Sequence, residues 1–321
     1  EVSFAETFTW LPFGGDPIGT HFPGVQFSSR RMNASDTTVT GHTGSFIFCY
    51  SNHRESFHFD YTDMAWKNIE PIDTDIISGG GVESIALDAD QIFVLGLASG
   101  WNQVAIYDIP SNQWTYPLRG VTSRQLFLPE LAVLDSGNVL VLGGTKPGDR
   151  PNDLVEIYNL ESGTFTTVAI NPMAEELDNL GDAYADIRTA ILPDGRVFLM
   201  NANHGLVSLF DPVEKIFHPL TSVENNLVRS VSRMDICNVE PLVLADGGIF
   251  VGGSIIRNLT SVEPIIFDGF EKGFCAFEGF SFSDSSQVIL EDGRILFVGV
   301  TTSDNIYGTS GGDWVPGAWW F

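Results

Sequence analysis

One apolar stretch recurs six times along the chain, and no other feature of the sequence constrains the fold as strongly. The starting positions of the six runs are 46, 47, 58, 52 and 46 residues apart. The runs are Phe46–Cys49, Ile92–Leu95, Val139–Leu142, Val197–Met200, Ile249–Gly252 and Ile295–Val298. A shorter apolar stretch that ends in Leu precedes each of the last five, with a tight turn such as Pro193-Asp194-Gly195 between them. Asp-Gly between two apolar runs indicates a β-hairpin, because Gly accepts the positive φ that matches strand twist.

A pair of aromatic residues, seven positions apart, follows each of the six runs. The pairs are Phe59/Trp66, Tyr107/Trp114, Tyr158/Phe165, Phe210/Phe217, Phe267/Phe274 and Tyr307/Trp314. In five of them the first aromatic is followed directly by Asp or Asn. We expect each pair to begin in a third strand and to fill the space between neighbouring sheets.

Units of 40–58 residues with four short strands are typical of β-propeller blades. A four-stranded sheet that is apolar on both faces buries them by stacking against its neighbours in a ring. The sequence therefore predicts an all-β fold with one domain over residues 1–321, a six-bladed propeller of four-stranded antiparallel blades. The blades are expected at about residues 36–70, 82–118, 129–170, 187–220, 239–278 and 284–321.

Residues 1–35 precede the repeats and are expected to form an N-terminal arm or closing strand. Thr7–Phe13 has the pattern of an outermost strand, and we expect it to close the ring on the sixth blade. Two alternatives stay open: the arm packs on the surface, or Val315–Phe321 supplies the last outer strand.

The repeats resemble those of the kelch family, in which a hydrophobic strand ends in Gly-Gly and is followed by Tyr-Asp and then Trp. The full diglycine is present only at Gly143-Gly144. The first position is kept at Gly96, Gly253 and Gly299 and replaced at Tyr50 and Asn201. The resemblance covers about residues 36–321 and implies a kelch-type propeller, related in fold to galactose oxidase. The Cys–Tyr pair and histidines of that enzyme's copper site have no counterpart that aligns, so no cofactor is evident.

The charge of the chain bears on its partners. There are 41 acidic and 16 basic residues, a formal net charge of −25. Such a surface repels phosphate backbones and anionic lipids, which argues against nucleic-acid and membrane-surface partners. No apolar run approaches the roughly 18–20 residues of a membrane-spanning helix.

Several weak signals favour a secreted glycoprotein. The sequence begins at Glu1 without Met, as a processed secreted chain or a trimmed chain would. Asn33 and Asn258 each begin an Asn-X-Ser/Thr sequon. Three cysteines cannot all pair with one another: Cys49 lies in a strand-like run, and Cys237 and Cys275 are the two that could form a disulfide.

A ring of polar residues is expected where the innermost strands begin. Counting back four residues from the Leu that ends each first strand gives Glu83, Glu130, Arg188, Glu240 and Ser286, with the first blade's equivalent near Thr37. Carboxylates gathered at a channel mouth raise one another's pKa and can act as acid and base. They could equally bind Ca²⁺ or a cationic or polyhydroxylated ligand, with Arg188 orienting a carboxylate. In a purely structural alternative, they cap backbone amides or pair with Arg188.

The loops between second and third strands are expected at the same mouth. They carry His53, Arg54, Trp101, Lys146, Arg150, His204 and Arg257 as candidate ligand contacts. The connection Asn171–Ile187 is rich in acidic residues. Three interpretations are open, namely a lid, a cation-binding loop or a solvated loop.

Three functions follow from these features. The first is a secreted module that binds a small molecule, a glycan or an extracellular protein. The second is an enzyme that uses the channel-mouth carboxylates, such as an epimerase, a lyase or a glycoside-directed enzyme. The third is an acidic matrix protein that recruits Ca²⁺.

Overall fold

The computed structural model describes the repeats in separate segments. The described residues are 37–42, 45–50, 55–60, 65–73, 83–88, 90–98, 101–117, 126, 129–146, 150–180, 187–201, 204–220, 241–251, 254–264, 280–289, 295–302 and 314–320. They fall into two compact units, residues 37–180 and residues 187–320, which divide between Ala185 and Asp186. Each unit is described by itself.

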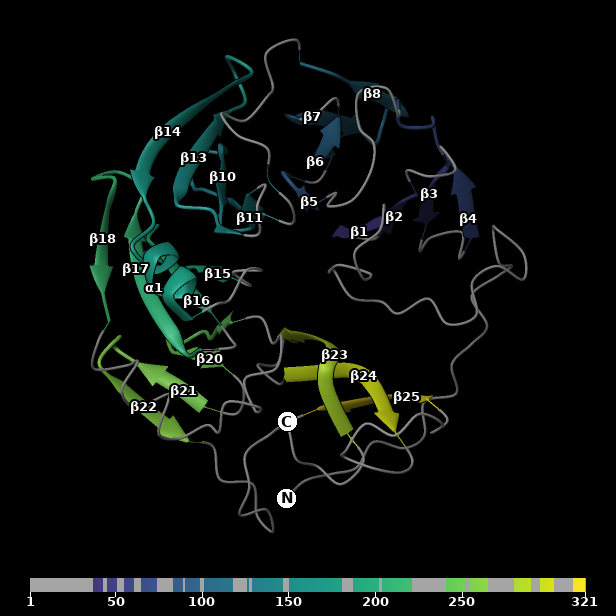
Figure 1. Cartoon of the computed structure of the whole chain (residues 1–321). Coiled ribbons are helices and arrows are strands. Elements are labelled where there is room, and N and C mark those ends of the chain that lie inside the picture. Colours follow the sequence, from purple (N-terminus) through teal and green to yellow (C-terminus); the bar gives the residue numbers. More distant parts are fainter. Residues whose placement is uncertain are drawn as a thin grey trace. The chain divides into compact units, whose positions relative to one another are not determined.

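The first unit contains three four-stranded antiparallel sheets. Their strands are β1 (Thr37–His42), β2 (Ser45–Tyr50), β3 (Glu55–Asp60) and β4 (Ala65–Asn68); β5 (Glu83–Ala86), β6 (Gln91–Ala98), β7 (Trp101–Asp108) and β8 (Gln113–Thr115); β9 (Glu130–Val133), β10 (Val139–Leu142), β13 (Leu154–Asn159) and β14 (Thr164–Ile170). A small hairpin of β11 (Thr145–Lys146) and β12 (Arg150–Pro151) joins β10 to β13, and helix α1 (Met173–Leu180) follows β14. In each large sheet the strands pair in chain order (Figure 1).

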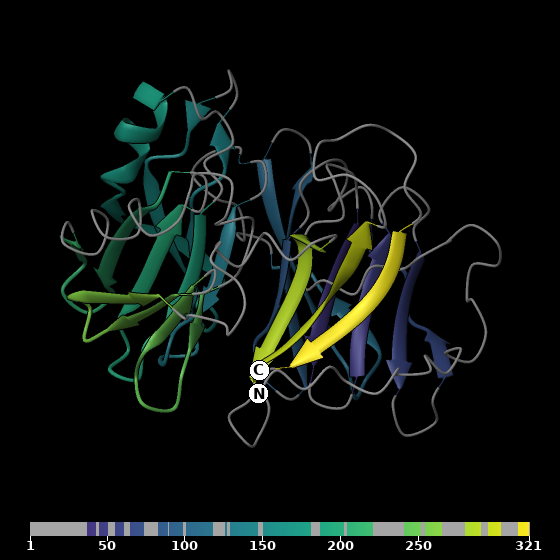
Figure 2. The same cartoon turned by 90° about the horizontal axis from the view of Figure 1, so that it is seen from below.

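The second unit has two four-stranded sheets and one of three strands. Their strands are β15 (Ile187–Ile191), β16 (Val197–Asn201), β17 (Leu206–Asp211) and β18 (Ile216–Pro219); β19 (Leu242–Val243), β20 (Ile249–Val251), β21 (Ser254–Arg257) and β22 (Ser261–Pro264); β23 (Phe280–Ile289), β24 (Ile295–Thr302) and β25 (Trp314–Trp320). Figure 2 shows the last three side by side, in yellow-green and yellow. The all-β prediction with four-stranded antiparallel sheets is therefore confirmed, whereas the count of six blades and the closure of a ring stay predictions.

The predicted hairpins between first and second strands form as expected. In four of them the amide of the Leu that ends the first strand donates to the carbonyl four residues later, at 2.8–2.9 Å. Gly137, Gly195 and Gly247 occupy the same turn position with φ of 80–82°, a left-handed conformation that favours Gly over residues with a side chain. The Gly of these turns in the sequence thus marks a position where the backbone needs a positive φ.

In the first four sheets the aromatic pairs lie directly opposite each other across the third and fourth strands. The ring centroids are 5.0 Å apart in Tyr107–Trp114 and 4.9 Å apart in both Tyr158–Phe165 and Phe210–Phe217. The Asp or Asn after the first aromatic closes the turn to the fourth strand. Asp108, Asn159 and Asp211 each accept, through Oδ1, the amide of the residue three positions later.

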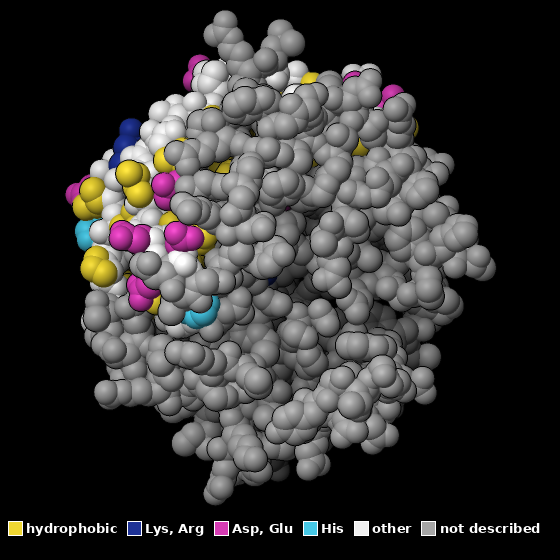
Figure 3. All heavy atoms as spheres, viewed as in Figure 1, with side chains coloured by type: hydrophobic (Ala, Val, Ile, Leu, Met, Phe, Trp, Pro, Cys, Tyr) yellow, Lys and Arg dark blue, Asp and Glu magenta, His cyan; other side chains and the backbone are white. Residues whose placement is uncertain are grey.

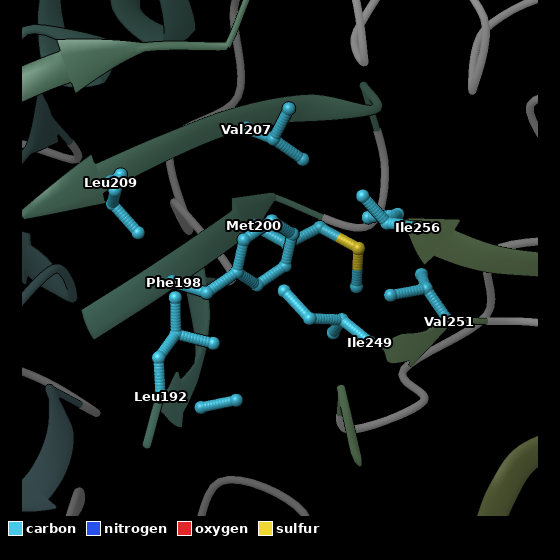
Figure 4. Packing of buried hydrophobic residues seen from close by; sticks show 9 residues of the cluster. Leu192, Phe198, Met200, Val207, Leu209, Ile249, Val251 and Ile256 are labelled. Carbon is cyan, nitrogen blue, oxygen red and sulfur yellow. The ribbon is translucent and has the colours of Figure 1, made fainter. Parts of the chain in front are cut away.

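Within each unit, neighbouring sheets pack through these apolar faces. Tyr158 of β13 contacts Phe93 of β6, with the ring centroids 5.2 Å apart, and both side chains are fully buried. In the second unit Phe198 and Met200 of β16 meet Ile249 and Ile256 of the adjoining sheet (Figure 4). The side chains of this cluster are apolar and buried, so it holds the two sheets together through the hydrophobic effect.

Two of the strand predictions are wrong. The third strand of the fifth sheet is Ser254–Arg257, not a strand around Phe267, because the chain turns back immediately after β20. In the sixth sheet Trp314–Trp320 pairs directly with β24, so this segment is the third strand and not the fourth. Phe267, Phe274 and Tyr307 lie outside the described residues, as do the N-terminal arm, Cys237 and Cys275. Among the described residues, no helix is long and apolar enough to cross a membrane.

Candidate functional site

The structure places four of the predicted inner residues at one equivalent position of their sheets. Glu83 pairs with Leu95, Glu130 with Leu142, Arg188 with Met200 and Ser286 with Val298, and each partner is the fourth residue of its apolar run. The equivalence expected from the sequence therefore holds in the strand register. Glu240 lies outside the described residues.

Glu83 and Glu130 belong to the same unit and to neighbouring innermost strands. Strand β5 lies beside β9 and also beside β1. Both glutamates stand at the start of their strands and are partly buried. Because the register is equivalent, this arrangement sets two carboxylates at the same end of adjacent strands.

Arg188 occupies the equivalent place in the other unit and is almost completely buried, with 4% of its surface exposed. Its Nη1 donates to the carbonyl of Ile187 at 3.3 Å. A buried guanidinium keeps its charge, so Arg188 is a fixed cation at the start of β15.

His204 lies at the same end of its sheet as Arg188. Asn201 is buried at the end of β16, and its Oδ1 accepts the amide of His204 at 2.9 Å. Its carbonyl accepts the amide of Gly205, also at 2.9 Å. Asn201 therefore fixes the turn that carries the partly buried His204.

Three other loop candidates also lie at this end of their sheets. Trp101 begins β7 opposite Ala98, at the end of the sheet where β5 begins. Lys146 and Arg150 face each other across the β11–β12 hairpin, which extends the end of the sheet where Glu130 stands. His53 and Arg54 fall outside the described residues.

Arg257 does not lie where the sequence analysis put it. Because β21 is the third strand, Arg257 ends that strand at the opposite end of its sheet, beside the turn between β19 and β20. Its Nη1 makes an ion pair with Asp246 of that turn. Gly248 permits this contact, since a Cβ there would come within 2.8 Å of the Arg257 Nη1.

Asn258 follows Arg257 in the exposed turn between β21 and β22, with φ of 51°. This second sequon therefore lies at the end of the sheet away from the loops between second and third strands. A glycan on Asn258 would leave those loops uncovered on its own sheet. The other sequon, at Asn33, is outside the described residues.

The acidic connection after β14 begins as a helix, which the sequence analysis did not predict. Pro172 precedes α1, and Asn171 caps it, because its Oδ1 accepts the amide of Met173 at 3.1 Å. Met173, Ala174 and Leu177 are buried, while the acidic residues are exposed. The exposed acidic residues are Glu175, Glu176 and Asp178, and Figure 3 shows acidic side chains in magenta over this helix. Within α1 a helical turn points successive carboxylates in different directions. The rest of this connection, with Asp182 and Asp186, lies outside the described residues.

One group of metal-ligating side chains lies away from the predicted site. Asp211, Glu214 and His218 each offer a ligand atom, and these atoms lie within 4.8 Å of one another. In the sequence, Asp211 stands out only as the residue that follows the first aromatic of its pair, Phe210. The signal that could have found the group is the hairpin register, which sets Asp211 and His218 on one face.

No protein-family model matches the sequence, and no curated protein matches it either. Among solved structures, the fold is similar to that of virginiamycin B lyase from Staphylococcus aureus. The TM-score is 0.50 at 9% sequence identity, over 81% of this chain and 76% of the other. A fungal alcohol oxidase of the AA5 family, in complex with copper, matches with a TM-score of 0.39 and 15% identity, over 82% and 69%. The first similarity, together with the four-stranded sheets, supports a propeller-type fold, and at this identity it shows the fold alone.

Proposed function

We propose that this chain is a secreted, kelch-type propeller that binds a small molecule or a glycan at the ends of its innermost strands. The proposed contacts are Glu83, Glu130, Glu240 and Arg188. Further proposed contacts are Trp101 at the start of β7, Lys146 of β11 and His204 in the turn after β16. An extracellular protein is the other class of partner that the acidic surface permits.

One observation carries this proposal, the equivalent register of Glu83 and Glu130 on neighbouring strands. Strands β5 and β9 place their glutamates at the same end, and both side chains are partly exposed there. Two acceptor groups on neighbouring strands suit the hydroxyl groups of a sugar or a cationic group. Arg188 stands at the same register position in its own unit, where its side chain is almost completely buried.

The test uses the full chain and a panel of immobilised glycans and small molecules, with binding confirmed by calorimetry. We expect Glu83→Gln and Glu130→Gln to remove most of the binding to any ligand that the wild type retains, since each variant loses charge but keeps shape. Glu161→Gln, in the exposed turn after β13, is the matched control and should bind normally. Unchanged binding by both inner variants would refute the proposed site.

A second candidate function is acid/base catalysis by the same two glutamates. It is favoured by the same neighbouring placement, because an epimerase or lyase needs an acid and a base that both reach one substrate. If Glu83→Gln abolishes turnover of a bound ligand while binding is kept, the enzyme interpretation holds. If the bound ligand is recovered unchanged from wild type after long incubation, the binding function holds.

Secretion is proposed on the sequons and the acidic surface. Expressed in a eukaryotic secretory system, the chain should carry a glycan at Asn258, because this residue is exposed in a turn. Asn258→Gln should then migrate faster on a denaturing gel, and glycosidase treatment should remove the difference. A secreted chain with an unmodified Asn258 would contradict the prediction.

A further inference from the structure

The hairpin β17–β18 brings two carboxylates and an imidazole together at the surface of the second unit. Asp211 ends β17, Glu214 lies in the turn, and His218 lies in β18. One carboxylate oxygen of each acidic residue and one imidazole nitrogen lie within 4.8 Å of one another. This spacing allows a single ion to contact all three.

The hairpin register explains why these side chains converge. Asp211 pairs with Ile216 and Leu209 pairs with His218, so Asp211 and His218 are diagonal neighbours. Side chains alternate along a strand, which places both on the face opposite to the Phe210–Phe217 pair. The aromatic contact on the other face, with centroids 4.9 Å apart, holds the two strands in this register.

The turn also fixes the first carboxylate. Oδ1 of Asp211 accepts the amides of Val213 and Glu214, both at 2.9 Å. These bonds orient the side chain and leave Oδ2 as the oxygen for a ligand. Lys215, with φ of 59°, then returns the chain into β18.

Two other hairpins of the chain have the same turn but not the same side chains. In β7–β8 the positions of Asp211, Glu214 and His218 are held by Asp108, Ser111 and Thr115, and in β13–β14 by Asn159, Ser162 and Thr166. The serine amides make the same bond to the preceding Asp or Asn. The turn therefore requires neither a glutamate nor a histidine. The backbone conformation of β17–β18 does not explain why Glu214 and His218 are present.

The overall charge of the chain also favours a cation. The nearby guanidinium of Arg196 pairs with Asp194, with 2.5 Å between Nη2 and Oδ2, so its strongest partner is not Asp211. The whole chain carries a net charge of −25. Cations are therefore drawn to this surface.

From these observations we propose that Asp211, Glu214 and His218 form a site for a first-row divalent metal ion such as Zn²⁺. Two carboxylate oxygens and one imidazole nitrogen form a mixed oxygen and nitrogen set that suits Zn²⁺, whereas Ca²⁺ and Mg²⁺ prefer oxygen alone. Three protein ligands leave at least one position for water or an outside ligand. Because β18 is the last strand of its sheet, the ion joins this strand to β17 through side chains.

The test measures Zn²⁺ bound per full-length chain by competition with a chromophoric chelator, and the spectrum of bound Co²⁺. Glu214→Ser and His218→Thr give this hairpin the side chains of its two relatives, so the fold should persist, as circular dichroism can check. We expect either change to remove one Zn²⁺ equivalent and to abolish the visible Co²⁺ bands. Glu161→Ser, in the β13–β14 turn, is the matched control and should bind as wild type does.

Three results would overturn the site. In one, both variants bind as much Zn²⁺ as the wild type. In another, His218→Thr leaves binding unchanged while Glu214→Ser weakens it, which would indicate a cation held by oxygen alone. In the third, the chelator removes all of the Zn²⁺ from the wild type at once.

Discussion

Tyr158 and Tyr107 hold equivalent positions in neighbouring sheets and differ in what their hydroxyl groups meet. The Tyr107 hydroxyl donates to Oδ1 of Asn112 at 2.8 Å. The counterpart of Asn112 is Gly163, and the buried hydroxyl of Tyr158 has no hydrogen-bond partner among the described residues. Burial raises the pKa of Tyr158 to about 12. The chain therefore tolerates one unsatisfied hydroxyl beside an aromatic contact that stabilises the sheet.

We expect Gly163→Asn to stabilise the protein by about 1 kcal/mol, because the new amide can accept the Tyr158 hydroxyl and the unfolded chain loses freedom. Asn tolerates the left-handed φ of 67° at this position. A Cβ there would meet Pro117 at an ordinary 3.5 Å. Urea unfolding of Gly163→Asn, Tyr158→Phe and the double variant measures the coupling.

In the wild type, Tyr158→Phe should cost almost nothing, whereas Tyr107→Phe should cost about 1 kcal/mol through loss of its bond to Asn112. In the Gly163→Asn background, Tyr158→Phe should become costly as well. A zero coupling energy between positions 158 and 163 would show that the new amide does not reach the hydroxyl.

Asp194 gives a prediction on pH. The Arg196 side chain, by its hydrogen bonds to Asp194 Oδ2 at 2.5 and 2.8 Å, holds the pKa of Asp194 below the ordinary 3.8. A depressed pKa favours the ionised form in the folded state, so its contribution to stability is present above about pH 4 and is lost as the pH falls through the folded pKa. The contribution is small, because both side chains are at least one-third exposed.

We expect Arg196→Gln to raise the pKa of Asp194 toward the ordinary value, as measured by NMR titration of the carboxyl carbon. Asp108 is the internal reference. Its pKa is lowered by hydrogen bonds from Ser111, which do not involve Arg196, and should stay the same. If the pKa of Asp194 does not move in the variant, the ion pair is not its cause.

At the scale of single elements, helix α1 depends on its first cap. Asn171 is 1% exposed and its Oδ1 accepts the Met173 amide. Asn171→Ala should lower the free energy of unfolding by about 1 kcal/mol, since a buried helix amide then loses its partner. Thermal unfolding followed by circular dichroism measures the loss.

Asn171→Asp is the companion variant, because it keeps the accepting oxygen and removes the amide nitrogen Nδ2, which has no partner among the described residues. It should be clearly more stable than Asn171→Ala at neutral pH, as a negative charge is also favoured at a helix N-terminus. Equal stability of the two variants would show that the cap contributes nothing.

Local patterns predicted the elements well, and the reason is physical. Strand, turn and aromatic positions each depend on neighbours within about ten residues, so Leu192, Asp194 and Gly195 identify their hairpin without the rest of the chain. Arg257 was misplaced because the third strand was expected around Phe267, whereas β21 already begins at Ser254 and pairs with β20. Helix α1 was missed because three buried residues among acidic ones are too short a pattern for a helix.

At the scale of the whole molecule, the candidate site was only partly predictable. The register of Glu83, Glu130 and Arg188 follows from counting within each repeat, which is local. The approach of side chains from different repeats depends on how sheets stack, and that is set by contacts far apart in the sequence. The Asp211–Glu214–His218 group was missed for another reason. The Asp after the aromatic was taken as part of a repeated pattern, and the side chains on the same face of its hairpin were not considered.

The last sheet leads to a prediction for the chain ends. Among the described residues it has three strands where the other large sheets have four, and β25 is at its edge. The sequence predicts that Thr7–Phe13 supplies the missing strand. Removal of residues 1–13 should then lower the unfolding temperature by several degrees, since an edge strand loses its backbone partner.

A shuffled 1–13 segment of the same composition is the control and should be as unstable as the deletion. Full stability of the deleted chain would exclude a closing role for this segment. Full stability of the shuffled chain would show that the segment packs without a defined register.

The three outer hairpins that share one turn give the chain a means of variation. Their backbones follow the same path through Asn112, Gly163 and Lys215, while the side chains they carry range from serine and threonine to glutamate and histidine. New chemistry can therefore arise at such a hairpin by two substitutions, with no adjustment in the strands behind it. In each of these hairpins the side chains can be exchanged, by evolution or by design, while the backbone of the sheet stays the same.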